Sequence, residues 1–455
     1  MKYFKHALYN YLKYYITLIK LFKNYENLNM QNKSILFVGL GKLGLSLAAI
    51  LAQKHNVIGY DINQKHIEDL KIGNLVNIEN DVRDFLNKKK LKLEFTNKID
   101  FSEFDKLQSI FILIPTNSSI HGEYSYKNLL YLIKNIINKV KLNKKLLKQK
   151  ILINICSTLQ PGTYKNYLEP LEKKNNFINF TYVPEFVACG TTIKNFLYPD
   201  QLVIGANSKF AEKKILSLYS RVIKTNNIKK ISIEGCEMVK LCSNSFICNK
   251  ISFANLIGEI CFNNKILDTS TVLESIGLDS RIGNKFFKSG PPFGGLCFPK
   301  DVRAFKNLCK KSKVNHSLIS SVEKINYNKM SFLIKNINLI IKKHKISKIG
   351  IIGYTFKEDT KVTEESQYEK IMKKLNIERI NVYDENIKYI KIHKKFNKEI
   401  SLNNLIKKNK IIIIFHNKKK YMDLAKNFKK NIFYSVWSNS NYFVHDLNMN
   451  SNIKK

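Results

Sequence analysis

The stretch that decides the fold is SILFVGLGKLGLSLAAI, residues 34–50. It begins with an apolar run, turns at Gly39, Gly41 and Gly44, and continues with apolar residues at helical spacing. A buried strand that leads through a glycine turn directly into a helix is typical of a doubly wound α/β domain. The first glycine permits the tight turn, the second lets the backbone approach a pyrophosphate, and the third lets helix and strand pack closely.

An acidic residue ends the next predicted strand, VIGYD at 57–61. A carboxylate at this position accepts the ribose hydroxyls of a dinucleotide and repels the 2′-phosphate of NADP. No arginine follows Asp61, so the pattern favours NAD as the cofactor. The alternative is a tight turn with a helix-capping aspartate and no ligand. The candidate cofactor residues here are Gly39, Gly41, Leu43, Gly44 and Asp61.

Further apolar runs alternate with helical patterns, which predicts parallel sheets with crossover helices. In the first half these runs are SIFILIP (109–115) and KILINIC (150–156). A second alternating region starts near Lys348. Between the two regions, a helical stretch runs from Cys236 to about Lys265, broken by no proline and only by one glycine. We therefore expect two Rossmann-like doubly wound α/β domains joined by a central long-helix domain.

The formal net charge is +41, from 77 Lys and Arg against 36 Asp and Glu. One interpretation is a nucleic acid or an anionic membrane as partner. The other is coding bias, because Lys, Asn and Ile crowd almost every segment and no arginine-rich arm or aromatic-interleaved basic patch stands out. The scattered lysines favour the second interpretation, so we expect no nucleic-acid partner. A basic surface still suits an anionic nucleotide substrate.

The eight cysteines include no C-x-x-C pair and have no accompanying histidine cluster, so no metal site is expected and a reducing cytoplasm fits. No apolar run reaches the roughly 18 residues that would span a bilayer, so we expect no stable membrane insertion. Residues 1–29 are aromatic and basic, without a cleavage site. They predict a disordered extension, or a start assigned upstream of Met30, rather than a signal peptide; a helix on a membrane surface is the alternative.

One cysteine stands out, in FGGLCFPKD at 293–301. Glycines before Cys297 and Pro299 after it predict a thiol at a loop tip, and Lys300 brings a positive charge close. The other seven cysteines are expected to be small buried hydrophobic residues. A thiol beside a dinucleotide points to oxidation of an alcohol to an acid. Thiolate addition to the intermediate aldehyde gives a thiohemiacetal, which can lose a second hydride and leave a thioester.

The segment RIGNKFFKSGPPFGGLCFPKD (281–301) resembles the active-site segment of the UDP-glucose/GDP-mannose dehydrogenase family, and most closely that of its bacterial members that act on UDP-glucose. The resemblance runs from about Lys33 to about Tyr442. It includes IPTN (114–117), STLQPGT (157–163), PEF (184–186), EMVKLCSNSF (237–246) and GYTFKEDT (353–360). It implies two NAD-dependent oxidations that convert the C6 alcohol of UDP-glucose to the carboxylate of UDP-glucuronate.

The resemblance also implies residue roles. Cys297 would be the nucleophile, Lys240 and Asn244 would stabilise the oxyanion and hold a water, and Asp301 would be a supporting carboxylate. Thr158 would help to position water, and Glu185 would serve thioester hydrolysis. The implied additional NAD contacts are Thr116, Thr158 and Lys300. The implied substrate residues are Glu185, Phe186, Lys240, Asn244, Arg281, Phe286, Lys288, Gly290, Gly294 and Lys357, with Arg281 coming from the same or a neighbouring subunit.

The predicted divisions follow from these assignments. Residues 1–30 are an extension, 31–215 an NAD-binding domain, 216–330 a central helical domain with a dimer contact and the cysteine loop, and 331–455 a C-terminal domain that binds the UDP-sugar. The resemblance implies assembly through the central helix as a homodimer or a higher homo-oligomer. Taken singly, the site residues have ordinary alternatives; Lys240 would be a solvated lysine and Glu185 a helix cap.

Some positions depart from the family pattern. His66 stands where a lysine follows the ribose-binding acid, Gln201 replaces the arginine of a PDR segment, and Cys189 replaces an acid. In the segment after Lys357, Val362 replaces an aspartate and Glu364 an arginine. A charge reversal at Glu364 predicts weaker NAD binding, by roughly 1–3 kcal/mol if a charged hydrogen bond is lost. An aspartate usual near the C-terminal sheet is not evident in NIFYSVW (431–437).

Several functions remain open from the sequence alone. The same chemistry on GDP-mannose or a UDP-N-acetylhexosamine is the nearest alternative, although the ending CFPKD disfavours the N-acetyl class. A catalytically weak homologue that only binds nucleotide sugars is a different class, motivated by Val362 and Glu364. A basic nucleic-acid binder is a third.

Overall fold

The computed structural model describes residues 33–75, 78–99, 106–142, 150–187, 190–264 and 268–437. The predicted extension at 1–30 and the departure at Cys189 lie outside these residues. The chain divides into two compact units, which are described one at a time. The first comprises residues 1–116 and 126–237, and the second comprises 117–125 and 238–455.

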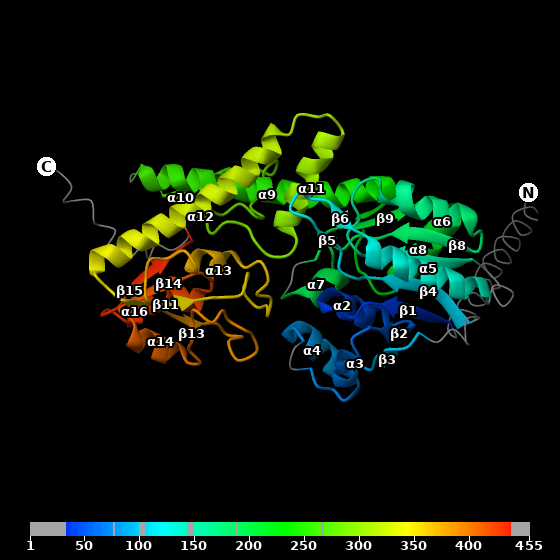
Figure 1. Ribbon diagram of the computed structural model, residues 1–455, viewed down its shortest axis with the longest axis horizontal. Coiled ribbons are helices and arrows are strands. Elements are labelled where there is room, and N and C mark those ends of the chain that lie inside the picture. Colours follow the sequence, from blue (N-terminus) through cyan, green and yellow to red (C-terminus); the bar gives the residue numbers. More distant parts are fainter. Residues whose placement is uncertain are drawn as a thin grey trace, which may run out of the picture. The chain divides into compact units, whose positions relative to one another are not determined.

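A single mixed sheet organises the described part of the first unit (Figure 1). Its eight strands follow the order β10-β9-β8-β7-β4-β1-β2-β3. Because β1 pairs in parallel with both β2 and β4, the strand order reverses beside β1. The strands are β1 (Ser34–Val38), β2 (Asn56–Tyr60), β3 (Leu93–Thr96), β4 (Leu107–Ile112), β7 (Ile151–Ile155), β8 (Ile178–Tyr182), β9 (Leu202–Ala206) and β10 (Ile228–Ile231).

Both faces of this sheet are covered, which explains why its central strands are apolar at every position. In β1, Ile35 and Phe37 join a core that helices α2 and α8 complete, while Leu36 and Val38 on the opposite face are also buried. The helices and the π-helix η3 of this unit are α2 (Lys42–Leu51), α3 (Gln64–Lys71), α4 (Asn80–Lys88), α5 (Lys127–Leu142), η3 (Tyr164–Leu168), α6 (Glu169–Lys174), α7 (Thr192–Leu197) and α8 (Lys209–Tyr219).

One edge of the sheet departs from the purely parallel arrangement that the sequence predicts. Strand β9 pairs with β8 in the antiparallel sense, through Thr181 with Ala206 and Tyr182 with Gly205, while β10 continues in parallel to β9. The chain between β8 and β9 contains only the short α7, which packs on α2.

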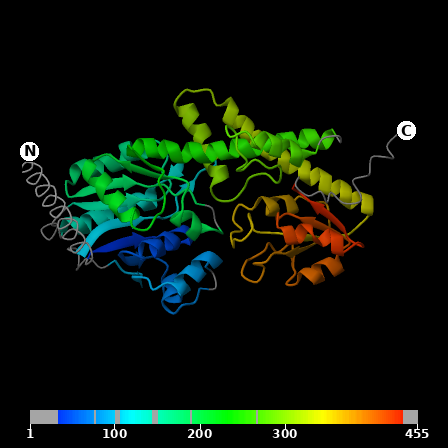
Figure 2. The same ribbon diagram turned by 180° about the vertical axis from the view of Figure 1, so that it is seen from behind.

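The second unit begins within a long helix. Helix α9 (Ile233–Asn263) starts three residues before the predicted Cys236 and crosses the division between the units. Within the second unit it packs beside α12 (Ser317–His344), where Phe262 meets Phe332 edge to face. The two helices lie side by side in Figures 1 and 2. The unit also contains α10 (Thr269–Gly277), α11 (Phe298–Lys311) and a small hairpin of β5 (Asn117–Ser118) and β6 (Tyr124–Ser125).

The second unit also contains a parallel sheet, which is coloured yellow-orange to red in Figure 2. Its order is β13-β12-β11-β14-β15. Helix α12 supplies Leu333, Ile337 and Ile341 to the core on one face, and α14 supplies Leu405 and Ile406 to the other. The remaining elements are β11 (Lys348–Ile352), α13 (Gln367–Met372), β12 (Arg379–Tyr383), β13 (Asn397–Lys398), α14 (Leu402–Lys408), β14 (Ile411–Ile414), α15 (Lys419–Met422), α16 (Leu424–Asn427) and β15 (Ile432–Ser435).

The predicted fold class is confirmed, with two Rossmann-like sheets and a central region of long helices. The exact domain boundaries at 215, 330 and 331 stay predictions. In the described part of the chain, no helix combines the length and the apolar character needed to cross a bilayer.

Candidate functional site

The glycine turn after β1 has the geometry that its sequence predicts. Gly39 has a φ of +97°, and its N–H donates to the Tyr60 carbonyl at 2.8 Å. A Cβ at Gly44 would lie 1.9 Å from the Gly39 carbonyl oxygen, so helix α2 packs against the turn only because residue 44 is glycine. A Cβ at Gly41 would meet nothing within 4 Å, so the backbone at the start of α2 faces open space.

Asp61 is tied to this turn. Its Oδ2 accepts the Leu40 N–H at 2.8 Å, and its Oδ1 accepts the Asn63 N–H at 2.9 Å. Each carboxylate oxygen keeps acceptor capacity for a ribose hydroxyl. His66, one of the departures from the family pattern, places Nε2 2.9 Å from the Leu40 carbonyl oxygen. A neutral imidazole must therefore carry its proton on Nε2, and His66 stabilises the turn by donating this hydrogen bond.

The loops after β4 and β7 are joined at the same edge of the sheet. The Ser157 hydroxyl accepts the Ile114 N–H and donates to the Ile114 carbonyl, both at 2.8 Å. This bond links the loops that carry Thr116, which is buried, and Thr158, which is partly buried. Because the carboxyl ends of parallel strands meet at one edge, both loops lie on the side of the glycine turn.

Glu185 and Phe186 follow β8 and are partly buried. The Tyr219 hydroxyl lies 3.5 Å from Glu185 Oε1 and belongs to a cluster of buried polar side chains. Asn154 Nδ2 lies 3.1 Å from Cys156 Sγ and 3.4 Å from the Tyr219 oxygen. Burial, with the negative charge of Glu185, holds the pKa of the Cys156 thiol well above its usual range. Cys156 is thus a neutral buried thiol. Cys236, Cys248 and Cys261 are also buried as expected, whereas Cys242 and Cys309 are only partly buried.

Cys297 is exposed and sits immediately before α11. One turn further on, Asp301 is 1 % exposed, and its N–H donates to the Cys297 carbonyl at 3.0 Å. Two uncharged donors hold the Asp301 carboxylate: Asn244 Nδ2 of α9 at 2.6 Å, and the Tyr124 hydroxyl of β6 by a short contact. The structure therefore brings together three of the predicted catalytic residues, Cys297, Asp301 and Asn244.

Two candidate lysines flank this group. Lys300 Nζ lies 4.8 Å from the centre of the Tyr124 ring, within the range of a cation–π contact. Lys240 is partly buried and lies one helical turn before Asn244 on α9, so both share a helix face as predicted.

The predicted substrate segment forms a folded loop around the cysteine. Phe286 has a positive φ of 60°, is half exposed, and meets Phe298, the residue after Cys297, edge to face. Gly290 donates its N–H to Asn255 Oδ1 at 2.8 Å, and a Cβ there would lie 2.4 Å from the Trp437 ring. Lys288 is exposed between them. Gly294 is likewise closed in, because a Cβ there would lie 2.2 Å from Gln367 Oε1.

Arg281 lies apart from that loop. Its side chain is 87 % exposed and forms a two-pronged ion pair with Asp279 of its own turn. In the described part of this chain it therefore points to solvent rather than into a buried site.

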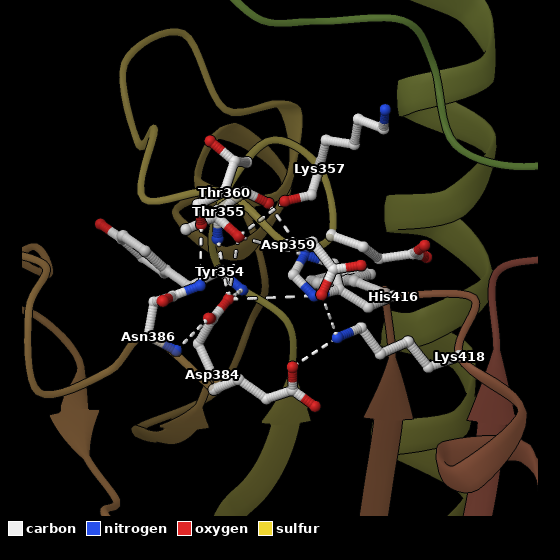
Figure 3. A network of polar contacts seen from close by, with 12 residues as sticks. Tyr354, Thr355, Lys357, Asp359, Thr360, Asp384, Asn386, His416 and Lys418 are labelled. Atoms are coloured by element: carbon white, nitrogen blue, oxygen red, sulfur yellow. Dashed lines mark hydrogen bonds and ion pairs between the residues drawn. The ribbon is translucent and has the colours of Figure 1, made fainter. Parts of the chain in front are cut away.

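A second glycine turn, after β11, repeats the backbone pattern of the first (Figure 3). The Gly353 N–H donates to Tyr383 O at 2.8 Å, and the Tyr354 N–H donates to Asp384 Oδ2 at 2.9 Å. Asp384 also accepts the Thr355 N–H and hydroxyl, both at 3.1 Å, and is 2 % exposed. Its carboxylate is thus used internally.

The space over this second turn is filled by a side chain. A Cβ at Gly353 would lie 2.6 Å from the His416 ring, whose Nε2 lies 3.0 Å from the Thr355 carbonyl. A loop, not a helix, follows the turn, because α13 begins only at Gln367. Lys357 lies in that loop, is exposed and points away from the network in Figure 3. The first sheet alone of the two therefore offers an open glycine turn that leads straight into a helix.

The departures in this loop have separate structural settings. Val362 is buried, and its carbonyl accepts the Phe356 N–H at 3.0 Å, whereas Glu364 is exposed. The sequence interpretation did not include Tyr124, Tyr219 or Trp437. Each touches a candidate site residue from a distant part of the chain, and no local motif marks such a contact.

Comparison with known proteins agrees with this geometry. Residues 33–223 match the NAD binding domain of the UDP-glucose/GDP-mannose dehydrogenase family, and residues 234–328 match its central domain. The fold and the open glycine turn define an NAD-dependent dehydrogenase of the doubly wound class. The chain belongs to the UDP-glucose/GDP-mannose dehydrogenase family, and it is an NAD-dependent oxidoreductase of nucleotide sugars.

Individual relatives support the assignment of this chain to the family. The UDP-glucose 6-dehydrogenase of Rickettsia prowazekii is 33 % identical over 334 residues, which cover 72 % of this chain and 74 % of that protein. The UDP-glucose 6-dehydrogenase TuaD of Bacillus subtilis is 32 % identical over 72 % of this chain and 70 % of its own length. Among solved structures, a UDP-glucose dehydrogenase from Pyrobaculum islandicum has the same fold, with a TM-score of 0.77 at 23 % identity over 90 % of this chain and 98 % of that one.

The two glycines of the first turn make a matched pair of variants. Gly41→Ala is expected to keep the melting temperature, because the new methyl meets no protein atom, but to weaken NAD binding by about 1–3 kcal/mol, or roughly 5- to 150-fold in Kd. Gly44→Ala is expected to lower the melting temperature, because its methyl collides with the Gly39 carbonyl. Thermal melts and calorimetric NAD titration test both. Wild-type NAD affinity in Gly41→Ala would show that the open space at the turn is not the pyrophosphate site.

Proposed function

We propose that this protein oxidises the C6 alcohol of UDP-glucose to the carboxylate of UDP-glucuronate in two steps, with Cys297 as covalent nucleophile. The observation that carries the proposal is the exposed Cys297 thiol at the start of α11, backed one turn later by the buried Asp301 carboxylate that Asn244 and Tyr124 hold. The sequence relatives named UDP-glucose 6-dehydrogenase favour this sugar.

The thiol accounts for oxidation beyond the aldehyde. NAD, when bound at the first glycine turn, accepts one hydride at each oxidation. The first oxidation converts the alcohol to an aldehyde, whose carbonyl carbon must add a nucleophile before it can lose a second hydride. Addition of the Cys297 thiolate forms a C–S bond and a thiohemiacetal, whose oxidation leaves a thioester. Water then cleaves the C–S bond, releasing the carboxylate and regenerating the thiol.

The surrounding residues supply charge and a fixed geometry. Lys240 would stabilise the negative charge that develops on the substrate oxygen in each addition step, and Asn244 would help to hold the attacking water. Asp301 is suited to orient that water, because uncharged donors fix its carboxylate in a buried position. Glu185 and Thr158 would position water for thioester hydrolysis.

The cofactor would lie on the first sheet. Gly39, Gly41, Leu43 and Gly44 would hold the pyrophosphate at the start of α2, and Asp61 would accept the ribose hydroxyls. Additional contacts would come from Thr116, Thr158 and Lys300. The nucleotide sugar would be held by Phe186, Arg281, Phe286, Lys288, Gly290, Gly294 and Lys357. Because the nucleophile must stay reduced, we place the protein in the cytoplasm.

A substrate comparison tests the sugar and the stoichiometry. The purified protein is incubated separately with UDP-glucose, GDP-mannose and UDP-N-acetylmannosamine, and NADH is counted per sugar consumed. We expect UDP-glucose to give the highest kcat/KM and two NADH per sugar. A higher kcat/KM with either of the other sugars would show that this sugar, and not UDP-glucose, is the preferred substrate. Nucleotide binding without NADH at any pH would instead identify a binding homologue, the alternative that Glu364 suggests.

The nucleophile has a matched control on its own helix. Cys297→Ser is expected to bind UDP-glucose with unchanged affinity and to lose net turnover by on the order of 10³-fold or more, because a serine hydroxyl is a far weaker nucleophile. Cys309→Ser, further along α11, is expected to keep wild-type turnover. Steady-state NADH production and substrate titration measure both. A normal yield of two NADH per sugar from Cys297→Ser would remove the covalent mechanism.

We also propose a homodimer or higher homo-oligomer built on α9. One side of this helix exposes large apolar side chains, which is unusual for a surface that faces only water. These residues are Met238, Phe246, Phe253, Leu256 and Ile260, between 41 % and 63 % exposed. Successive members are spaced so that they form one stripe along the helix. A second copy that presents the same stripe would bury it.

The most exposed member of the stripe offers the test. Phe246→Glu is expected to convert the oligomer to a monomer with an unchanged circular dichroism spectrum, since it places a charge in an apolar contact. Tyr131→Glu on α5, where the tyrosine is 72 % exposed, serves as the control and should keep the assembly. Sedimentation velocity gives the mass of each. An unchanged mass for Phe246→Glu would place the subunit contact elsewhere.

A further inference from the structure

A fully buried carboxylate lies at the start of α9. Glu237 is 0 % exposed, and its two oxygens accept two backbone N–H groups from one loop. Oε2 accepts the Gly162 N–H at 2.8 Å, and Oε1 accepts the Tyr164 N–H at 2.7 Å. Gly162 lies near the end of the STLQPGT segment. Tyr164 is the first residue of η3, which leads directly into α6.

A buried acid is costly in this position, although its carboxylate form makes strong bonds. Backbone N–H groups at a helix start have no partner within the helix, and a charged acceptor makes stronger bonds to them than a neutral one. Burial nevertheless raises the pKa of Glu237 to about 7, against the lowering effect of the bonds from Tyr164 and Gly162. Burying a carboxylate costs free energy, whereas serine, threonine or asparagine can cap a helix without a buried charge.

The loop that Glu237 holds carries a proposed catalytic residue. Thr158 lies four residues before Gly162 in the same loop, and the loop has further fixed points along its length. The Leu159 N–H donates to the Tyr182 hydroxyl at 3.3 Å, and the Gln160 N–H donates to the Tyr126 hydroxyl at 2.8 Å. Glu237 therefore completes a set of bonds that leaves the loop around Thr158 little freedom.

The helix to which Glu237 belongs carries two more. Lys240 and Asn244 follow Glu237 by three and seven residues on α9, which puts all three near one face of the helix. Because α9 is one continuous helix, the residue that binds the Thr158 loop lies on the same element as Lys240 and Asn244. The same carboxylate thus acts on the loop of Thr158 and on the helix of Lys240 and Asn244.

We propose that Glu237 is a positioning residue, whose carboxylate couples the Thr158 loop to the start of the helix that bears Lys240 and Asn244. It touches neither cofactor nor substrate and acts through these residues. The proposal rests on the proposed function for its effect on turnover, but the coupling itself is measurable without a substrate. The alternative is that Glu237 contributes to folding alone.

A glutamine replacement separates the two. In Glu237→Gln the amide oxygen can accept one N–H, but the amide nitrogen would face the other. We expect faster amide hydrogen exchange at Gly162 and Tyr164. We also expect kcat, calculated per NAD-binding site so that unfolded protein is not counted, to fall by on the order of 10²-fold, while KM for NAD stays within about twofold of wild type. Glu234→Gln is the matched control. Glu234 lies three residues earlier on α9, and its Oε2 accepts a hydrogen bond from the Asn207 amide at 3.3 Å.

The pH profile gives a readout that folding alone would not move. Protonation of Glu237 turns one acceptor into a donor, so wild-type kcat is expected to fall as pH drops below about 7. In Glu237→Gln this contribution should be absent, so the ratio of the variant's kcat to the wild-type kcat should rise as pH drops below about 7. The charged and titratable groups that act on Glu237 are Glu234 and Cys236 of α9, Tyr126 beside α5 and Tyr182 of β8. The tyrosines and Cys236 stay neutral in this range because burial raises their pKa values.

The outcomes are distinct from those of the substrate test. Unchanged exchange at Gly162 and Tyr164 in Glu237→Gln would overturn the coupling, whatever the sugar. Faster exchange with wild-type kcat per NAD site, or a lower melting temperature as the sole change, would reduce Glu237 to a folding role and also overturn the proposal. If wild-type protein makes no NADH with any of the three sugars, the proposed function fails, and hydrogen exchange alone then decides the coupling.

Discussion

One hydrogen bond, from the amide after a glycine turn to the aspartate that follows the neighbouring strand, ties two adjacent strands together at the carboxyl edge of both sheets. In the first sheet the Leu40 N–H donates to Asp61, and in the second the Tyr354 N–H donates to Asp384. Each bond holds the end of one strand against the end of the next. The carboxyl edge of a parallel sheet is where loops gather and ligands bind. In the first unit this bond fixes the glycine turn after β1 to the end of β2.

The same bond leads to different chemistry in the two sheets. In the first, α2 starts immediately after the turn and Gly41 leaves space in front of its free N–H groups. In the second, His416 covers Gly353, and the acid is saturated by its own loop. A dinucleotide needs both the open backbone and the helix start, so the first sheet alone has the geometry for NAD. A shared backbone pattern is thus insufficient for a shared ligand.

Two buried carboxylates of this protein are held by uncharged donors. Asn244 and Tyr124 hold Asp301, and two backbone N–H groups hold Glu237. A carboxylate held this way is fixed in place by neutral partners rather than by an ion pair. Cys297 itself is exposed. The arrangement combines rigid supports with one accessible reactive atom, as a covalent mechanism requires.

The sequence by itself determined the elements whose signals are local. The glycine spacing from Gly39 to Gly44 predicted the turn, apolar runs predicted the central strands, and the uninterrupted stretch after Cys236 predicted α9 to within three residues at its start. Cys297 was evident as a loop thiol because its glycine and proline neighbours are adjacent in the chain.

The tertiary structure alone decided the contacts between distant residues. Asn244 and Asp301 are 57 residues apart, Gly162 and Glu237 are 75, and Tyr124 and Asp301 are 177. It also decided that β9 runs antiparallel to β8. Periodicity and turn residues report the conformation of a few neighbouring residues, whereas these pairings depend on how whole helices and strands pack. The sequence could therefore name most of the reactive groups, but not the partners that hold them in place.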